Sequence, residues 1–342
     1  MEIQTWMWLA TMGGLLAIIL TDLLIIGRRP HEPTLKEATT WVVLYVMLAV
    51  VFGLVILLTS GGQYAGEFFA GWLTEYSLSV DNLFVFVIIM GTFAVPREIQ
   101  QTVLLVGILI ALVMRGIFIA VGAAAIAAFS WIFYVFGVFL LYTAYKIATG
   151  KDTEGYTENV ALRLARRVLP TTEEYDGAKV VTRVNGRRLF TPMLIVMVAI
   201  GTTDLLFALD SIPAIFGLTQ EPYLVFTANA FALMGLRQLY FLLGGLLDRL
   251  VYLSYGLAFV LGFIGVKLIL EAAHENGFGW APTVPIWASL SVIVGSLAVT
   301  TLVSLAKVRR DRKRAAHAAH VPSQPGKSIG VPDDSPGPSV DR

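Results

Sequence analysis

The sequence predicts an all-α, polytopic membrane protein with about nine transmembrane helices. Of its 342 residues, 56% are hydrophobic and only 14% are charged, which leaves too little polar surface for a soluble domain. Apolar stretches of about 20 residues, the length that crosses the hydrocarbon core of a bilayer, recur along the chain. These stretches are too long and too continuous for the alternating strands of a membrane barrel.

The apolar stretches give the expected spans, which cover residues 5–26, 38–59, 66–92, 100–121, 124–148, 191–217, 223–247, 251–271 and 285–306. Arg28 and Arg29 follow the first span and no basic residue precedes it, so a cleaved signal peptide is not expected. Residues 1–306 therefore form one predicted transmembrane domain, interrupted by a polar loop at 149–190.

Basic residues predict the orientation of the chain. All lysines and arginines except Arg115, Arg237 and Lys267 fall in segments that nine spans place on one side of the membrane. Because such residues concentrate in cytoplasmic loops, the N-terminus is expected outside and the C-terminus in the cytoplasm.

The loop at 149–190 contains two predicted elements. "TENVALRLARRVL" is typical of a basic amphipathic helix. "KVVTRVNGRRLF" predicts a hairpin on an Asn185-Gly186 turn, and Thr191 and Pro192 are expected to cap and start the sixth span. We interpret the loop as a linker at the lipid headgroups, with a regulatory role as the alternative.

The C-terminal segment 307–342 is expected to lie outside the membrane. "KVRRDRKR" at 307–314 predicts a juxtamembrane contact with anionic lipid. The residues from about 315 onward are rich in Pro, Gly, Ser and Asp and predict a disordered cytoplasmic tail.

Two stretches within the apolar spans carry acids at the same spacing. Their matched pairs are Thr74-Glu75 with Thr203-Asp204, and Asp81-Asn82 with Asp210-Ser211. The next long apolar segment after each stretch carries one arginine, Arg115 or Arg237. The two stretches lie three spans apart, so they cross the membrane in opposite directions. This inverted-topology repeat is a recurrent plan of secondary transporters, which bind substrate near the bilayer midplane.

The four repeated acids are expected to face a polar interior, because an ionised carboxylate facing lipid costs several kcal/mol. Six residues of helix turn through about 600°, so Glu75 and Asp81 would point roughly 120° apart. A helix break near the "YSLS" segment or at Pro213 would let such acids line one cleft and would free carbonyl ligands.

The charges and atom types of these residues predict the ligand. Four carboxylates and two guanidinium groups leave a formal charge of −2, which a divalent cation would neutralise. Oxygen atoms from Asn82, Ser211 and Asn229 add to the carboxylates, and the chain has no cysteine. Oxygen ligation suits Mn²⁺, Ca²⁺ or Mg²⁺. The two arginines are expected to hold and tune the acids, or to compete as internal cations when the site is empty.

Structural explanations compete with this metal site. Intramembrane Asp–Arg pairs also act as packing contacts without a transported ligand. Asp22 is a weaker candidate, since an acid four residues from a helix end can reach the interface. Lys267 and Glu271 are expected to form a local ion pair across one helical turn. Glu67 and Glu221 lie at outer helix ends, where simple solvation is expected ahead of a role in attracting cations.

Several of these segments resemble the TerC/Alx family of integral membrane proteins, part of a wider group of inverted-repeat transporters that includes the lysine exporters. The resemblance covers about residues 1–306 and rests on "EYSLSVDN" at 75–82, "FTP" at 190–192, "TTDLLFALDSIPAIF" at 202–216 and "ALMGLRQLYF" at 232–241.

The resemblance implies Mn²⁺ export from the cytoplasm across a bacterial-type inner membrane, with links to tellurium resistance, to pH stress and to supplying Mn²⁺ to secreted proteins. By position, it assigns metal binding to Glu75, Asp81, Asn82, Asp204, Asp210 and Ser211. An acidic cavity should repel an oxyanion such as tellurite, so tellurium resistance is expected to be indirect.

Other functions remain open beside proton-coupled metal export. A Ca²⁺ transporter would use the same ligands, and a scaffold would bind stress-response or secretion proteins through the 149–190 loop. An intramembrane aspartyl protease also needs two buried acids. However, Asp204 and Asp210 share one helix, and Asp81 lacks a G-x-G-D context. We therefore expect no enzyme, no bound cofactor and no nucleic-acid partner.

Overall fold

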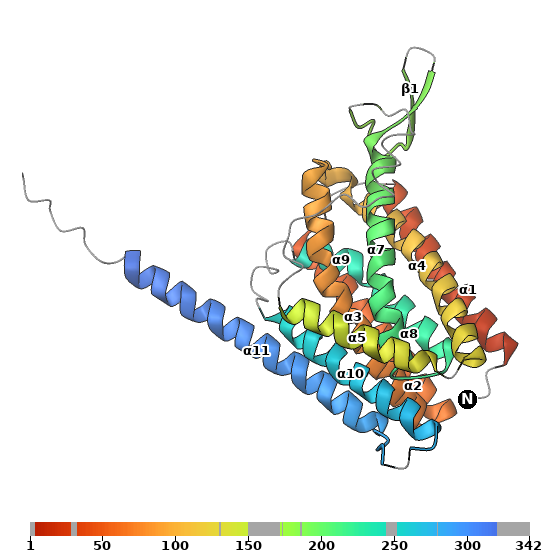
Figure 1. Ribbon diagram of the computed structural model, residues 1–342. Coiled ribbons are helices and arrows are strands. Elements are labelled where there is room, and N and C mark those ends of the chain that lie inside the picture. The colour runs from red at the N-terminus through yellow and green to blue at the C-terminus, as the bar shows by residue number, and fades with distance from the viewer. Residues whose placement is uncertain are drawn as a thin grey trace, which may run out of the picture.

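The computed structural model describes residues 4–28, 33–129, 131–149, 172, 174–184, 187–243, 252–278 and 280–319. Within these residues the protein is a bundle of long helices with one β-hairpin that projects beyond the helix ends (Figure 1). The expected all-α polytopic membrane fold is confirmed.

A helix lies at each of the nine predicted spans. The helices are α1 (Thr5–Arg28), α2 (Leu35–Ser60), α3 (Gly62–Thr92), α4 (Arg97–Ala128), α5 (Ile132–Ala148), α7 (Pro192–Phe216), α8 (Pro222–Met234), α9 (Leu236–Leu243), α10 (Leu253–Glu275) and α11 (Ile286–Ala319). Among the described residues, six helices are long and apolar enough to cross a membrane, and α1 and α5 contribute shorter apolar stretches.

Three predicted boundaries differ from the structure. The expected break at 122–123 is wrong, because α4 continues through an alanine-rich segment to Ala128 and alanine has the highest helix propensity. The seventh span is two helices, α8 and α9, interrupted at Gly235. The last helix continues to Ala319, so the predicted disorder is wrong for residues 315–319, where alanines again favour a helix.

The two acid-bearing helices are continuous. α3 runs unbroken from Gly62 to Thr92, so the expected break at "YSLS" is wrong. Pro213 lies in the last turn of α7, which ends at Phe216. A proline this close to a helix end removes one hydrogen bond without dividing the helix.

α3 and α7 run in opposite directions. At one end, the Thr219 hydroxyl, just past the end of α7, donates to Glu67 near the start of α3 at 2.6 Å. At the other end, the hydroxyl of Tyr175, which precedes α7, donates to the carbonyl of Phe93 at the end of α3 at 2.8 Å. The two matched stretches therefore have the opposed directions that an inverted repeat requires.

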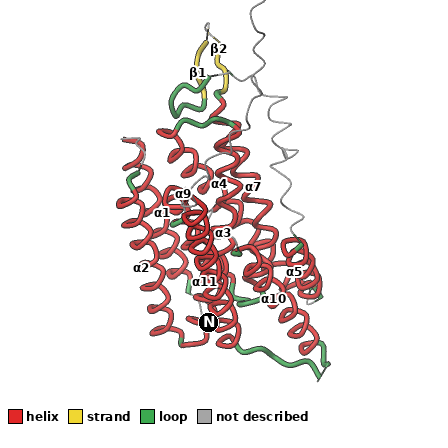
Figure 2. Tube along the Cα trace, turned by 90° about the vertical axis from the view of Figure 1, so that its left-hand side faces the viewer, coloured by secondary structure: helices red, strands yellow, loops and turns green. Residues whose placement is uncertain are grey.

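The predicted hairpin is present at the Tyr175 end of the bundle (Figure 2). β1 (Val181–Val184) pairs antiparallel with β2 (Arg187–Phe190). The turn residues and the predicted amphipathic helix lie outside the described residues. Thr191 occupies the N-cap position of α7, but its hydroxyl donates to the carbonyl of Lys179 at 2.6 Å instead of capping the helix.

Glycines bring α4 and α7 into close contact. Ile200 of α7 packs on Gly107 of α4, and Ile110 of α4 packs on Gly201 of α7. A Cβ atom added at Gly107 would lie 2.6 Å from Ile200 Cγ2. Small residues allow this approach in membrane helix pairs, and here they place Arg115 of α4 within reach of Asp204 of α7.

The outer surface of the bundle is apolar. Leu9 of α1, Leu58 of α2 and Leu302 of α11 expose 69%, 85% and 67% of their surface. Many other large apolar side chains on α2, α4, α5 and α11 are also exposed. Patches of this extent are expected to face a lipid or protein partner rather than water, as the membrane assignment requires.

Candidate functional site

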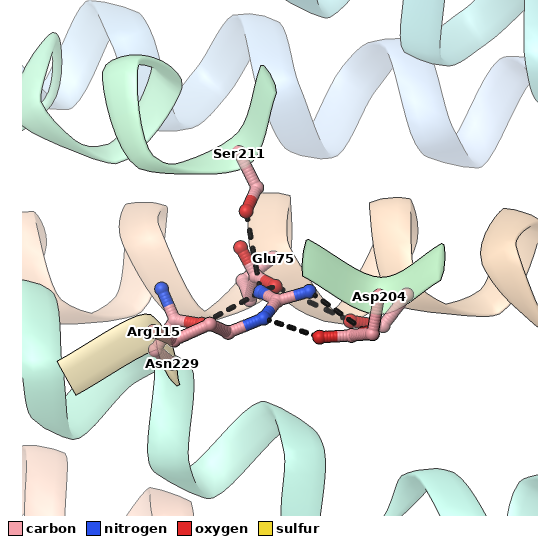
Figure 3. A network of polar contacts seen from close by, with 6 residues as sticks. Glu75, Arg115, Asp204, Ser211 and Asn229 are labelled. Carbon is pink, nitrogen blue, oxygen red and sulfur yellow. Dashed lines mark hydrogen bonds and ion pairs between the residues drawn. The ribbon is translucent and has the colours of Figure 1, made fainter. Parts of the chain in front are cut away.

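The guanidinium of Arg115 lies at the centre of a buried polar cluster (Figure 3). Its Nε donates to Asp204 Oδ2 at 2.9 Å, and its Nη2 donates to Asp204 Oδ1 at 3.2 Å. This two-point contact is the strongest geometry for an arginine and a carboxylate. It joins α4 of the first repeat to α7 of the second.

The third guanidinium nitrogen, Nη1, faces oxygens from three helices. It forms an ion pair with Glu75 Oε1 of α3. It also donates to Asn229 Oδ1 of α8 at 2.7 Å and to Ser211 Oγ of α7 at 3.2 Å. We call Glu75, Arg115, Asp204, Ser211 and Asn229 the Arg115 cluster.

Every residue of the Arg115 cluster is at most 1% exposed. The two carboxylates and one guanidinium carry a net charge of −1. Removing charges from water costs several kcal/mol per ion, and paired geometry with further hydrogen bonds offsets that cost. The cluster thus holds opposite repeats together and keeps oxygen atoms in a dry interior.

Helix periodicity explains why these side chains meet. Asp204 and Ser211 are seven residues apart, so they lie on one face of α7. Ser79 is one turn after Glu75 on α3, is buried, and donates to Glu75 Oε1 at 3.4 Å. Ser79 is absent from the predicted site, although its i,i+4 spacing from Glu75 could have identified it.

Asp210 lies outside the Arg115 cluster. It is half-buried, and its Oδ1 accepts a hydrogen bond from Thr143 of α5 at 3.2 Å. Six residues of helix place it roughly 120° around α7 from Asp204. The helix break that would let both acids of α7 line one cleft is absent, so Asp204 and Asp210 face different neighbours. Metal binding by Asp210 stays a prediction.

The structure describes the side chains of two other predicted ligands, Asn82 and Asn229, but not those of Asp81 and Asp22. Asn82 is half-buried on α3. The side chains of Asp81 and Asp22 lie outside the described part of the structure, so their role as ligands stays a prediction. Asn229, predicted as an additional ligand, is a member of the Arg115 cluster.

Arg237 is buried in α9. It lines a small cavity of about 30 Å³ with Ile18 of α1, Tyr45 of α2 and Leu112 of α4. The Arg115 cluster contains one arginine and two carboxylates and carries a charge of −1. The side chain of Asp81 lies outside the described residues, so the charge of −2 expected from pooling four acids and both arginines stays a prediction. The sequence matched the two arginines by position, but it did not indicate which helices surround each.

A larger cavity of about 410 Å³ opens at the end of the bundle opposite the hairpin. Its lining includes Glu67, Glu221, Glu271 and His274. Beside it, Lys267 donates to the carbonyl of Gly217 at 2.9 Å. Lys267 also pairs with Glu271 at 3.2 Å, which confirms the predicted ion pair.

The available oxygens match a hard cation in type. Glu75, Asp204, Ser211 and Asn229 offer carboxylate, hydroxyl and amide oxygens, the ligands that Mn²⁺, Mg²⁺ and Ca²⁺ prefer. In this structure they surround the guanidinium of Arg115. Among the described residues, no group of three or more acidic or histidine side chains is assembled to hold a metal.

Comparison with known proteins assigns the chain to a family. A profile described as the integral membrane protein TerC family matches residues 60–313. An uncharacterized membrane protein of Mycobacterium tuberculosis is 49% identical over 315 residues, which cover 88% of this chain and 79% of that relative. An uncharacterized membrane protein of Myxococcus xanthus is 41% identical over 304 residues, covering 89% and 93% of the two chains.

A further relative has a provisional functional name. Alx of Escherichia coli K12, described provisionally as a membrane-bound redox modulator, is 38% identical over 304 residues, which cover 86% of this chain and 92% of Alx. No solved structure is significantly similar to the chain. The profile match and the three relatives span both repeats and the Arg115 cluster, and the chain therefore belongs to the TerC family of integral membrane proteins.

Proposed function

We propose that the protein is a secondary transporter that exports a divalent metal ion, Mn²⁺ first, from the cytoplasm. The observation that carries the proposal is the Arg115 cluster: a dry set of oxygen ligands that two antiparallel helices bring together from opposite repeats. Alternating access in inverted-repeat transporters works around such a site. The membrane would be the cytoplasmic membrane, with the N-terminus outside.

The ligand atoms support a hard cation as cargo. Carboxylate, hydroxyl and amide oxygens bind Mn²⁺ and Ca²⁺ well, while soft metals prefer sulfur. Mn²⁺ and Ca²⁺ share these ligands, so Ca²⁺ transport is the alternative within the same class. We expect protons to return on the carboxylates that the metal leaves, which would couple export to the proton gradient.

The stress phenotypes implied by the resemblance would follow from metal handling. Tellurium and pH resistance would be indirect consequences of the intracellular Mn²⁺ level. The description of Alx suggests redox modulation, but this chain contains no cysteine. Thiol–disulfide chemistry would therefore need partner proteins. The hairpin beyond the helix ends supports a docking role for stress-response or secretion proteins as an addition to transport.

Mn²⁺ uptake into everted membrane vesicles tests the proposal. Vesicles with the wild-type protein should accumulate Mn²⁺, since the cytoplasmic face is outward. Glu75→Gln and Asp204→Asn should each lower the initial rate at least about tenfold, because each removes one of the two charged ligands. Asp176→Asn, in the polar segment before the hairpin, is the matched control and should leave uptake unchanged.

Two results decide between the alternatives. Unchanged uptake in both Glu75→Gln and Asp204→Asn would exclude the Arg115 cluster as the transport site. Accumulation of Ca²⁺ in preference to Mn²⁺, measured in the same vesicles with both ions present, would favour a Ca²⁺ transporter.

A further inference from the structure

The Nη1 nitrogen of Arg115 is surrounded by more acceptors than it can satisfy. This nitrogen carries two hydrogens. Three oxygens lie within hydrogen-bond reach of it: Glu75 Oε1, Asn229 Oδ1 at 2.7 Å and Ser211 Oγ at 3.2 Å. Two hydrogens cannot point directly at three oxygens, so at any moment one of the three receives no direct hydrogen bond from Nη1.

The carboxylate of Glu75 also has an unsatisfied atom. Glu75 Oε2 is fully buried and has no hydrogen-bond partner among the described residues, although a buried polar atom without a partner is costly. Together with the excess acceptor at Nη1, this atom makes the environment richer in oxygen ligands than the guanidinium requires. Such an environment suits a metal ion, which accepts several oxygens at once.

We propose that Arg115 is a tethered counter-cation, whose guanidinium occupies the position of the transported ion in the empty protein and withdraws when a divalent cation binds. This inference rests on the proposed function and adds a role for one residue. It assigns the position of Nη1, between Glu75, Ser211 and Asn229, to the cargo ion.

Charge supports mutual exclusion of the arginine and the metal. With the guanidinium inserted, the cluster carries −1. If a divalent ion joined it there, the buried cluster would carry +1 and two cations would share the same oxygens. The two cations would repel each other at close range, and neither could contact the full set of oxygens. With the guanidinium withdrawn, Glu75 and Asp204 carry −2, which the divalent ion neutralises.

A tethered counter-cation has a consequence for the transport cycle. Without it, the empty site would hold two carboxylates and would need two returning protons to become neutral. With Arg115 inserted, the cluster carries −1 and one returning proton neutralises it. Removing the guanidinium should therefore slow net export, which requires the empty protein to return, much more than the exchange of one metal ion for another.

Mn²⁺ binding to the purified full-length protein is the first test, with Arg115→Met replacing the guanidinium by an apolar side chain of similar length. If the guanidinium occupies the site in about 90–99% of empty molecules, its removal should tighten Mn²⁺ binding about 10- to 100-fold. Isothermal titration calorimetry measures the affinity directly.

Lys267→Met is the matched control for removing a buried cation. Lys267 is 5% exposed, but its partners among the described residues are the Gly217 carbonyl and Glu271, so Mn²⁺ affinity should stay at the wild-type value. Arg115→Lys keeps the positive charge without the planar fork and should bind Mn²⁺ with an affinity between those of the wild type and Arg115→Met. It also preserves the test if Arg115→Met fails to fold.

Transport in proteoliposomes is the second readout. Arg115→Met should slow net Mn²⁺ export much more than Mn²⁺–Mn²⁺ exchange, while Lys267→Met should retain both. A variant at Arg115 that binds Mn²⁺ more weakly than the wild type would overturn the counter-cation and make Arg115 a positioning residue, with the proposed function intact. A wild-type protein that neither binds nor transports a divalent ion would overturn the proposed function itself.

Discussion

Asp204 and Asp210 are the same residue type on the same helix, yet the structure gives them different surroundings. Asp204 is 1% exposed and accepts two hydrogen bonds from the guanidinium of Arg115. Asp210, six residues later on α7, is half-buried and accepts a hydrogen bond from the Thr143 hydroxyl. One acid is part of an ion pair between the two repeats, and the other contacts a neutral side chain of α5.

The difference shows that two acids on the same helix of a repeat need not have the same role. The spacing of six residues turns the two side chains roughly 120° apart on a continuous helix, so they meet different neighbours. A partner's charge then sets the cost of losing the acid. Removing one member of a buried ion pair leaves an uncompensated charge, whereas a hydroxyl partner has other ways to be satisfied.

The largest predicted effect comes from neutralising each acid in turn. Asp204→Asn should lower the free energy of unfolding by about 3 kcal/mol, because an amide N–H would face the guanidinium N–H groups and one charged partner of Arg115 would be lost. Asp210→Asn should lower it less, because the amide oxygen can still accept the hydrogen bond from Thr143. Unfolding in mixed detergent micelles measures both.

Thr143→Val provides the control for the smaller effect. It removes the hydroxyl donor to Asp210 and should destabilise the protein by about 1 kcal/mol, in the range for one hydrogen bond. Equal losses for Asp204→Asn and Asp210→Asn would contradict the different roles assigned to the two acids.

A smaller loss of stability is predicted for a change at the contact between α4 and α7. This contact places Arg115 beside Asp204. Gly107→Ala would bring a Cβ to 2.6 Å from Ile200 Cγ2 and should destabilise the protein by about 1–3 kcal/mol through overpacking. It should also slow Mn²⁺ uptake, because the Arg115–Asp204 geometry depends on this helix separation.

Two further variants test whether the effect of Gly107→Ala comes from overpacking or from replacing any helical glycine by alanine. Gly295→Ala, in α11, has no atom within 4 Å of the added Cβ and should be neutral or slightly stabilising, because alanine favours a helix. Gly107→Ala combined with Ile200→Ala removes the clashing side chain and should recover uptake. If the double variant stays inactive, the helix separation does not control the site.

Much of the fold could be predicted from the sequence because its signals are local. Apolar stretches long enough to cross a bilayer located a helix at each predicted span, and the Asn-Gly pair between β-prone residues located the hairpin. The errors fall where local signals are weak. The end of α4 was predicted too early, because an alanine-rich segment continues the helix. Gly235 interrupts the seventh span without changing its hydropathy.

The candidate site was predictable in composition but not in arrangement. Buried charged and polar residues are rare in a membrane helix, so Glu75, Asp204 and Arg115 stood out, and helix periodicity links Asp204 with Ser211. The sequence could not show that Asp210 faces Thr143, because that contact depends on which helix packs against the far side of α7. Long-range packing, unlike periodicity, leaves no mark in the local sequence.

The smallest predicted effect concerns a third aspartate, which completes the series from buried to exposed. Asp176 lies in the polar segment before the hairpin and accepts from the Thr182 hydroxyl at 2.8 Å and from Lys179 Nζ at 3.0 Å. These contacts, the Thr182 hydrogen bond first, hold the pKa of Asp176 below its ordinary value. Because the folded-state pKa is lowered, the contacts stabilise the segment above the unfolded-state pKa.

That stabilisation should be lost as the pH falls through the lowered pKa of Asp176. Thr182→Val removes the first cause and should move the pKa of Asp176 back toward its ordinary value, as followed by the NMR chemical shift of the carboxyl carbon. Global stability should not change, because the carboxylate is solvent-exposed and its pairs are screened. A titration of Asp176 identical in wild type and Thr182→Val would show that the hydroxyl does not tune this acid, and that partner identity matters only where water is excluded, as at Asp204.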